Sequence, residues 1–524
     1  MLGFAALYIL SMGGHGYGGV GTTTYDVTRS MVLYGSVAIK EVPWGKVASD
    51  GSFYAQYGIG HSLYNLPFYL IGHFFATLSP ALASQYDRLT MFTTLLGQPA
   101  ISALSCALLF LFCLRLGCSC DASIVCSCLY GLGTQAWVYA QLDFSEPILT
   151  FFLVASAYWL LRSSETRTRQ DPCCSEHGLG SASATTALVF AGLSAGIAMS
   201  VKIVALIVLP FLYLFIVLQA SRTAVPMRTK LCAFSVPLGI AGFGPVGTYN
   251  LLRFGSLFET GYSDEFTCYY GDVLRQFAEN LWSLEGSIIL YSPVILLAIP
   301  GAAVFYRRFR QIALLLFSII ASFFLFYPFT TNELYYGPRY LTPTLPFFML
   351  IVGVWLDRSF SARAPRKFRR AIIIFLLLLG IFQQLVGVLV NYHSYYWRIQ
   401  YALPLADEDV RNSEEGRRLQ ATPNLPHLLG HLWLLRQGLY GIFQNDGLPV
   451  EGLMLTASSN SGDRNDWIPY YGLDLWWCHR KILSQFGLSF PLSILSGLGA
   501  VVFVSCYQIW KIRKTSCDRA LFER

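Results

Sequence analysis

The chain has 524 residues, of which 54% are apolar and 13% are charged, and its net charge is +7. This balance excludes an ordinary soluble protein and predicts a polytopic membrane protein, since a helix needs roughly 20 mainly apolar residues to cross the hydrocarbon core. The basic excess does not indicate a nucleic-acid partner, because Lys and Arg gather at the ends of long apolar runs. The 13 cysteines form no metal-type pair with matching partners, and those in apolar helices are read as small hydrophobic residues.

Two apolar stretches near the N-terminus need separate interpretation. The first, 2–20, has no basic region before it, so we expect an uncleaved first span rather than a signal peptide. The second, 58–79, contains His61, Asn65 and Pro67, and counting it as a crossing would place every later basic cluster outside. We therefore expect 58–79 to be an interfacial or re-entrant segment on the outer face.

The remaining apolar stretches are expected to cross in alternating directions. They are 90–113, 121–139, 147–162, 185–200, 203–219, 232–250, 286–306, 311–328, 341–356, 371–392 and 486–510. Their basic ends then share the cytoplasmic side, as membrane proteins usually arrange them. The run 185–219 is too long for one helix, so we expect a hairpin that turns outward at Lys202. The predicted fold is an all-α bundle of about 12 transmembrane helices, with juxtamembrane helices on the outer face.

This topology brings a small set of polar residues to the outer ends of apolar helices. The set comprises Asp26, Arg88, Asp143, Glu146, Lys202, Asn250, Arg253, Arg339 and Tyr340. Ionisable groups near hydrocarbon are costly, so they are functional candidates. Individually, the cations could snorkel to the headgroups, and the two acids before Pro147 could be solvated or cap a helix. Together, acids and cations from separate loops suit an anionic membrane-embedded ligand beside a catalytic carboxylate.

Segments of this outer face resemble, in order and spacing, the GT-C superfamily of integral membrane glycosyltransferases, which use polyprenyl-phosphate sugars. The chain is similar to the bacterial relatives of the protein O-mannosyltransferases and the lipid A aminoarabinose transferase. The resemblance covers about residues 1–392 and is carried by TTYDVTRSMVLYG, AQYGIGHSLYNLPFYLIG, Arg88, YAQLDFSEPI, AGLSAGIAMSVK, YNLLRFGSLFETGY and YYGPRYLTPTLPF. The chain departs from that pattern at Asp26, which follows Tyr25 where the family often has a second acid.

The resemblance implies transfer of a hexose or pentose from a polyprenyl-phosphate donor to an acceptor hydroxyl, with inversion. Asp26 would be the catalytic base. The residues that would bind the donor phosphate are Arg339, Lys202, Arg88 and Tyr340. The residues that would contact the sugar or the acceptor, or hold a divalent cation, are Asp143, Glu146, Asn250 and Arg253. Apart from such a divalent cation the resemblance implies no cofactor, and the acceptor would be a glycan, a lipid or a protein.

We expect three regions along the chain. The catalytic transmembrane module is 1–392, with 21–89 as its first outer loop; an outer-face segment follows at 393–485, and the last span with a basic cytoplasmic tail at 486–524. The expected location is the inner membrane of a bacterium, with the site facing the periplasm or exterior. Cys268 and Cys478 lie well inside outward loops, where they are either free thiols or a disulfide.

Three other classes of protein stay open at this stage. A non-enzymatic membrane scaffold would not need acids and cations to converge on the outer face. A lipid or polysaccharide transporter would place its binding groups near the bilayer midplane, on broken helices within related halves. An O-antigen-type ligase would depend on a large outer loop, for which 393–485 is available.

Overall fold

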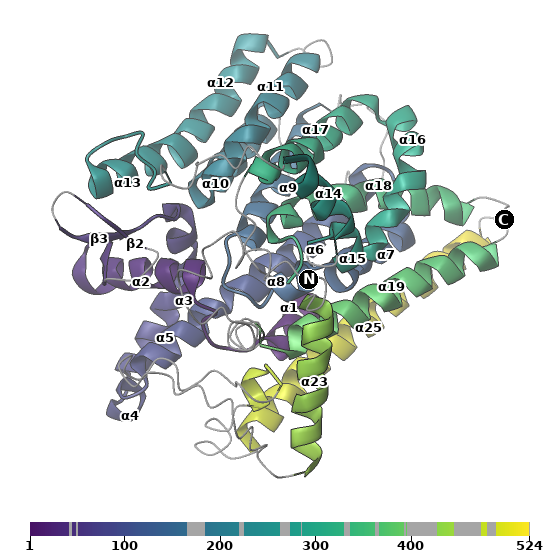
Figure 1. Cartoon of the computed structure of the whole chain (residues 1–524). Coiled ribbons are helices and arrows are strands. Elements are labelled where there is room, and N and C mark those ends of the chain that lie inside the picture. The colour runs from purple at the N-terminus through teal and green to yellow at the C-terminus, as the bar shows by residue number, and fades with distance from the viewer. Residues whose placement is uncertain are drawn as a thin grey trace.

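The structure is a computed structural model of the whole chain. It describes residues 1–40, 45–48, 51–164, 184–219, 225–262, 273–283, 286–329, 336–361, 366–391, 395, 427–444, 473–478 and 489–522. Within these ranges the chain is almost entirely helical (Figure 1). The predicted all-α membrane fold is therefore confirmed.

Seven helices are long and apolar enough to cross a membrane, among the residues described. They are Tyr86–Arg115, Ala184–Val201, Met227–Phe254, Arg310–Phe329, Arg339–Ser359, Lys367–Leu389 and Leu492–Ile509. Each coincides with a predicted span. The count of twelve stays a prediction. Four of the other expected spans form shorter or interrupted helices, whereas 147–162 lies within one continuous helix, Glu146–Ser163.

The interruptions have local causes in the sequence. The first stretch forms only α1 (Leu2–Ser11), and the glycine-rich run after it separates α1 from α2 (Gly19–Tyr34). Pro210 stands where a 3₁₀ segment gives way to α11 (Leu209–Leu218). Proline suits such a helix start because it has no backbone N–H to leave unpaired.

The other elements follow in chain order. Up to the hairpin they are α3 (Ile59–Thr77), α4 (Pro80–Ala83), α5 (Tyr86–Leu95), α6 (Gly97–Arg115), α7 (Cys120–Gly133), α8 (Ala136–Tyr139), α9 (Glu146–Ser163), α10 (Ala184–Val201) and the 3₁₀ segment η2 (Ile203–Val208). After it come α12 (Met227–Leu238), the π-helix η4 (Gly239–Phe243), α13 (Gly244–Phe254), α14 (Val273–Trp282), α15 (Ile288–Tyr291), η5 (Pro293–Leu297), α16 (Ala298–Arg308), α17 (Arg310–Phe326) and η6 (Tyr327–Phe329). The last are η7 (Arg339–Thr344), α18 (Leu345–Ser361), α19 (Arg366–Leu389), α23 (His427–Gln444), η9 (Trp476–Cys478) and α25 (Ser489–Phe522).

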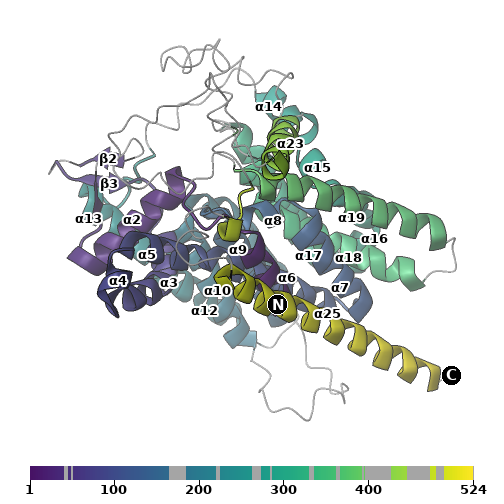
Figure 2. The ribbon, with the colours of Figure 1, turned by 90° about the horizontal axis from the view of Figure 1, so that it is seen from below.

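A small antiparallel sheet lies in the segment predicted to be the first outer loop. Its strands are β1 (Ala38–Ile39), β2 (Gly45–Val47) and β3 (Phe53–Ala55), in the order β1-β3-β2. Figure 2 shows β2, β3, α14 and α23 toward the same side of the bundle. These elements come from three of the predicted outward loops, as the alternating topology requires.

Close helix packing in the bundle depends on small residues. α10 packs between α9 and α12, and a Cβ at Gly192 would lie 2.0 Å from the backbone oxygen of Phe234. A Cβ at Gly196 would lie 2.9 Å from the backbone of Gly242 in the π-helix. The glycine spacing i, i+4 therefore lets two backbones touch, as small residues do between membrane helices.

Predicted cytoplasmic loops meet at one end of the bundle. Asp357 accepts a hydrogen bond from the backbone of Ser119 and lies 4.0 Å from Arg308. Gln311 bonds to Gln219 in the loop after α11. Four loops expected on the same side are thus neighbours, although which compartment they face stays a prediction.

Candidate active site

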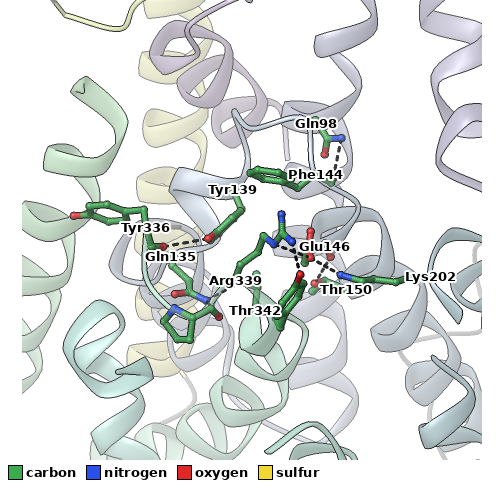
Figure 3. Close-up of polar contacts among 12 residues, drawn as sticks. Gln98, Gln135, Tyr139, Phe144, Glu146, Thr150, Lys202, Tyr336, Arg339 and Thr342 are labelled. Carbon is green, nitrogen blue, oxygen red and sulfur yellow. Dashed lines mark hydrogen bonds and ion pairs between the residues drawn. The ribbon is translucent and has the colours of Figure 1, made fainter. Parts of the chain in front are cut away.

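A buried carboxylate between two cations is the centre of the candidate site. Glu146 begins α9 and is 1% exposed. Its Oε1 lies 2.7 Å from Lys202 Nζ and 3.4 Å from Arg339 Nε. Burial raises the pKa of Glu146, but the two cations outweigh burial and hold that pKa below its ordinary value. Three loops predicted to face outward therefore converge on one ion cluster (Figure 3).

Aromatic rings surround the two cations. Lys202 Nζ lies 4.3 Å from the ring centre of Tyr340, and the Arg339 guanidinium lies 4.6 Å from that of Phe144. Arg339 also donates to the Tyr340 hydroxyl at 2.7 Å, and Tyr340 stacks on Tyr327 with centroids 4.7 Å apart. Such contacts favour cations and hold their side chains in one orientation.

Neutral polar residues fasten the loops that carry the cluster. Gln135 donates to Pro338 O and to the Thr342 hydroxyl, and Tyr139 donates to Tyr336 O. These bonds fix the segment on both sides of Arg339, as Figure 3 shows. The sequence analysis did not select these residues, because isolated Gln and Tyr in apolar helices give no local functional signal.

Residues of α6 and α3 hold the loop 140–146, here called the acidic loop, on the side away from Arg339. Gln98 donates to Phe144 O at 3.2 Å and lies 3.3 Å from His61 Nε2. His61 is 1% exposed, and burial lowers its pKa to about 4, so the imidazole is neutral. His61 Nδ1, Gln98 Oε1 and Glu146 Oε2 are buried and have no hydrogen-bond partner within the described part of the chain, so these polar atoms could contact a ligand.

Asp143 lies three residues before Glu146 in a different environment. It is 5% exposed, and the backbone N–H of Tyr17 lies 3.3 Å from Oδ2 and 3.4 Å from Oδ1. Burial raises the pKa of Asp143 to about 7 although this N–H partly opposes it. The alternative of a solvated loop acid is therefore wrong for both Asp143 and Glu146.

Asp26 lies in the middle of α2 and is 9% exposed. Its helix packs on α3, because Thr28 donates to Ser62 O and the Ser62 hydroxyl donates to Thr24 O. α3 in turn abuts the hairpin turn: a Cβ at Gly60 would lie 2.5 Å from the backbone of Val201, the residue before Lys202. The role of Asp26 as the base stays a prediction.

The structure gives three other candidates contacts of their own. Arg88, in α5, donates to Gln85 at 2.8 Å. Arg253 donates to the backbone oxygen of Ala55 in β3 and to Asn250 Oδ1, and Asn250 donates to Leu257 O. Arg253 thus connects α13 to the small sheet, and Asn250 holds Arg253 and the turn after α13. These contacts brace the sheet and are separate from the Glu146 cluster.

The sequence left open a divalent cation at the acidic residues and a disulfide between Cys268 and Cys478. Among the residues described, no group of three or more His, Cys, Asp or Glu side chains is arranged to hold a metal ion. Cys268 and the side chain of Cys478 lie outside the described part of the chain.

Comparison with known families bears on the resemblance to membrane glycosyltransferases. The family model for dolichyl-phosphate-mannose-protein mannosyltransferase matches residues 36–229, a segment that includes Asp143, Glu146 and Lys202. The match confirms the resemblance predicted from the sequence: the chain is similar to the GT-C membrane glycosyltransferases that include the protein O-mannosyltransferases. No curated protein matches the chain.

Solved structures that the chain resembles include those of ArnT and AglB. ArnT from Cupriavidus metallidurans in the apo state has 15% identity and a TM-score of 0.48, over 82% of this chain and 73% of that chain. ArnT bound to undecaprenyl phosphate has 14% identity and a TM-score of 0.46, over the same shares. Archaeal oligosaccharyltransferase AglB from Archaeoglobus fulgidus, in complex with an inhibitory peptide and a dolichol-phosphate, has 13% identity and a TM-score of 0.46, over 80% and 59%.

Proposed function

We propose that the chain is a membrane glycosyltransferase that moves a sugar from a polyprenyl-phosphate donor to an acceptor hydroxyl, with inversion, on the extracytoplasmic face. The observation that carries the proposal is the convergence of Lys202 and Arg339 on buried Glu146. The match to a family named for a dolichyl-phosphate-mannose donor supports the same donor class. No general acid is needed, because phosphate is already a good leaving group.

The cations suit the task of holding the donor phosphate. Arg can bind a phosphate with two parallel N–H bonds, whereas Lys acts as a compact charge. Glu146 contacts both cations, so it orients them before the donor arrives. Preorganised donors of this kind stabilise negative charge without rearrangement at the moment of reaction.

In the reaction, the acceptor oxygen forms a bond to C1 of the sugar. The C1–O bond to phosphate breaks, and its electron pair goes to the phosphate oxygen beside Lys202 and Arg339. The acceptor proton goes to a carboxylate, for which we propose Asp26. Asp143 is the alternative base because its pKa of about 7 lies near working pH, as efficient proton transfer requires. Glu146 does not suit this role, since its pKa is lowered.

The test uses purified protein in lipid vesicles with a panel of polyprenyl-phosphate-linked hexoses and pentoses. We expect release of polyprenyl phosphate that depends on an added hydroxyl acceptor and is lost in Lys202→Ala and Arg339→Ala. Arg308→Ala is the matched control, because Arg308 pairs with Asp357 at the opposite end of the bundle. Movement of the intact donor across the vesicle without cleavage would instead indicate a transporter and overturn the proposal.

A further inference from the structure

The C-terminal segment 473–478 is bound to the chain between α1 and α2. Trp476 N–H donates to Met12 O at 3.0 Å. The indole N–H of Trp476 donates to Ile9 O, and that of Trp477 donates to Leu10 O, each at 2.8 Å. These carbonyls lie where α1 ends, so the C-terminal segment satisfies backbone groups that a helix end leaves open.

Asp474 is the polar centre of this contact. It is 0% exposed, and its Oδ1 lies 2.7 Å from His15 Nε2. Its Oδ2 accepts a hydrogen bond from the Tyr17 hydroxyl, also at 2.7 Å. The other nitrogen of His15, Nδ1, lies 3.1 Å from Gly16 O, so each ring nitrogen has an acceptor oxygen within hydrogen-bond distance, an arrangement that favours the protonated imidazole. Asn391 also approaches His15 Nε2, at 3.2 Å.

Tyr17 connects this cluster to the candidate active site. While its hydroxyl bonds to Asp474, its backbone N–H points at the carboxylate of Asp143. Asp143 is pressed against α2, because a Cβ at Gly21 would lie 1.8 Å from Asp143 Cγ. The same helix carries Asp26, five residues farther on. One residue thus connects the C-terminal segment to the acidic loop that also carries Glu146.

We propose that Asp474 is a positioning residue for the active site: it holds His15 and Tyr17 so that the Tyr17 N–H fixes Asp143 against α2. The C-terminal segment thereby completes a site whose other members come from the first 340 residues. This inference rests on the proposed function for its kinetic consequence. Its structural consequence, the ordering of 12–18 and of the acidic loop, is independent of what the enzyme transfers.

Hydrogen exchange of the full-length protein tests the structural consequence. Asp474→Asn keeps an oxygen for the Tyr17 hydroxyl but removes the charge beside His15. We expect faster deuterium uptake in peptides covering 12–18 and 136–146, whereas peptides of α17 stay unchanged. The control is Trp477→Phe, which removes one anchoring bond to Leu10 without touching Asp474. Unchanged uptake at 136–146 in Asp474→Asn would overturn the inference.

Turnover with polyprenyl-phosphate sugars tests the kinetic consequence. A misplacement of about 1 Å can cost on the order of 10²-fold in rate, so we expect kcat of Asp474→Asn to fall about 10- to 100-fold, while the KM for the donor changes less than about 2-fold. Trp477→Phe should keep wild-type kcat. Faster exchange with unaltered kcat would overturn the connection to the site. Faster exchange in a protein whose wild type releases no polyprenyl phosphate would support the positioning role and count against the proposed function alone.

Discussion

Asp143 and Glu146 are both buried carboxylates, three residues apart, yet their surroundings shift their pKa values in opposite directions. Glu146 touches Lys202 and Arg339, and its pKa is lowered. Asp143 faces a backbone N–H and helix α2, and burial raises its pKa to about 7. Residue type and sequence position therefore do not fix the role of an acid; its charged neighbours do. We therefore divide the site into an anion-binding side, made by Lys202, Arg339 and Glu146, and a proton-accepting side that holds Asp143 and Asp26. Substitutions on each side should have different effects.

The largest effect is expected at the proton-accepting side. Asp26→Asn keeps the size of the side chain but removes the basic oxygen, so turnover should fall about 10²–10⁴-fold while donor binding persists. Asp143→Asn should cost less if Asp143 only orients the sugar. Both variants are compared by single-turnover kinetics and by donor binding. A fully active Asp26→Asn enzyme would move the base to Asp143.

At the anion-binding side, Arg339→Ala should lower turnover by roughly 10²–10³-fold, the usual cost of losing one group that stabilises a developing charge. Donor affinity should fall as well, because the guanidinium acts before and during the transition state. Arg339→Lys should restore only part of the rate, since an ammonium lacks the planar fork. Full rescue by Lys would contradict bidentate binding.

The two acids should also affect stability with opposite dependence on pH. Asp143 has a pKa raised from 3.8 to about 7, so the stability it contributes is present below its unfolded pKa and is lost as pH rises toward 7. Glu146 has a lowered pKa, so its contribution is present above its unfolded pKa and is lost as pH falls.

Thermal unfolding at about pH 5 and about pH 7.5 measures this difference. Relative to wild type, Asp143→Asn should gain stability at the higher pH, by on the order of a few kcal/mol. Glu146→Gln should lose on the order of 3–5 kcal/mol there, because it leaves buried Arg339 and half-buried Lys202 without their carboxylate. The same pH slope in both variants would contradict the division between the two acids.

The smallest kinetic effect is expected at Arg253, which belongs to neither side of the site. Arg253→Ala removes the bonds to Ala55 O and Asn250, so the unfolding temperature should drop by about 1–3 °C, because each kcal/mol lost shifts a chain of this length by only about 1 °C. The kcat of the folded fraction should stay within about 2-fold, since Arg253 does not touch Glu146 in the proposed mechanism. A loss of kcat comparable to that of Arg339→Ala would place Arg253 in the site.

Much of the site follows from the sequence because membrane topology restricts where polar residues can meet. The break at Ser200–Lys202 and the acids before Pro147 could be predicted from apolar run lengths and basic clusters alone. Their pairing in the structure depends on three loops that each lie at a helix end. The same reasoning selected Arg253, whose contacts lie elsewhere, since an arginine after a span gives the same signal whether it binds a ligand or braces a sheet.

The contribution of the C-terminal segment could not be predicted in this way. Asp474 and Tyr17 are 457 positions apart, and neither stands at the end of a regular apolar run. His15 and Tyr17 lie in a glycine-rich interval that the expected first span covered over its whole length, although α1 ends at Ser11. Periodicity and charge patterns report local structure, whereas this cluster is made by tertiary contact alone.

The glycines of α10 have a mechanical consequence for the distant ion cluster. Gly192 leaves no room for even a methyl group against Phe234 O, and nine residues of helix, about 14 Å, separate it from the end of α10 beside Lys202. A side chain at position 192 would wedge α10 and α12 apart, and a stiff helix would act as a lever that swings the ammonium away from Glu146. The ion cluster therefore depends on a contact well over a nanometre away that carries no charge at all.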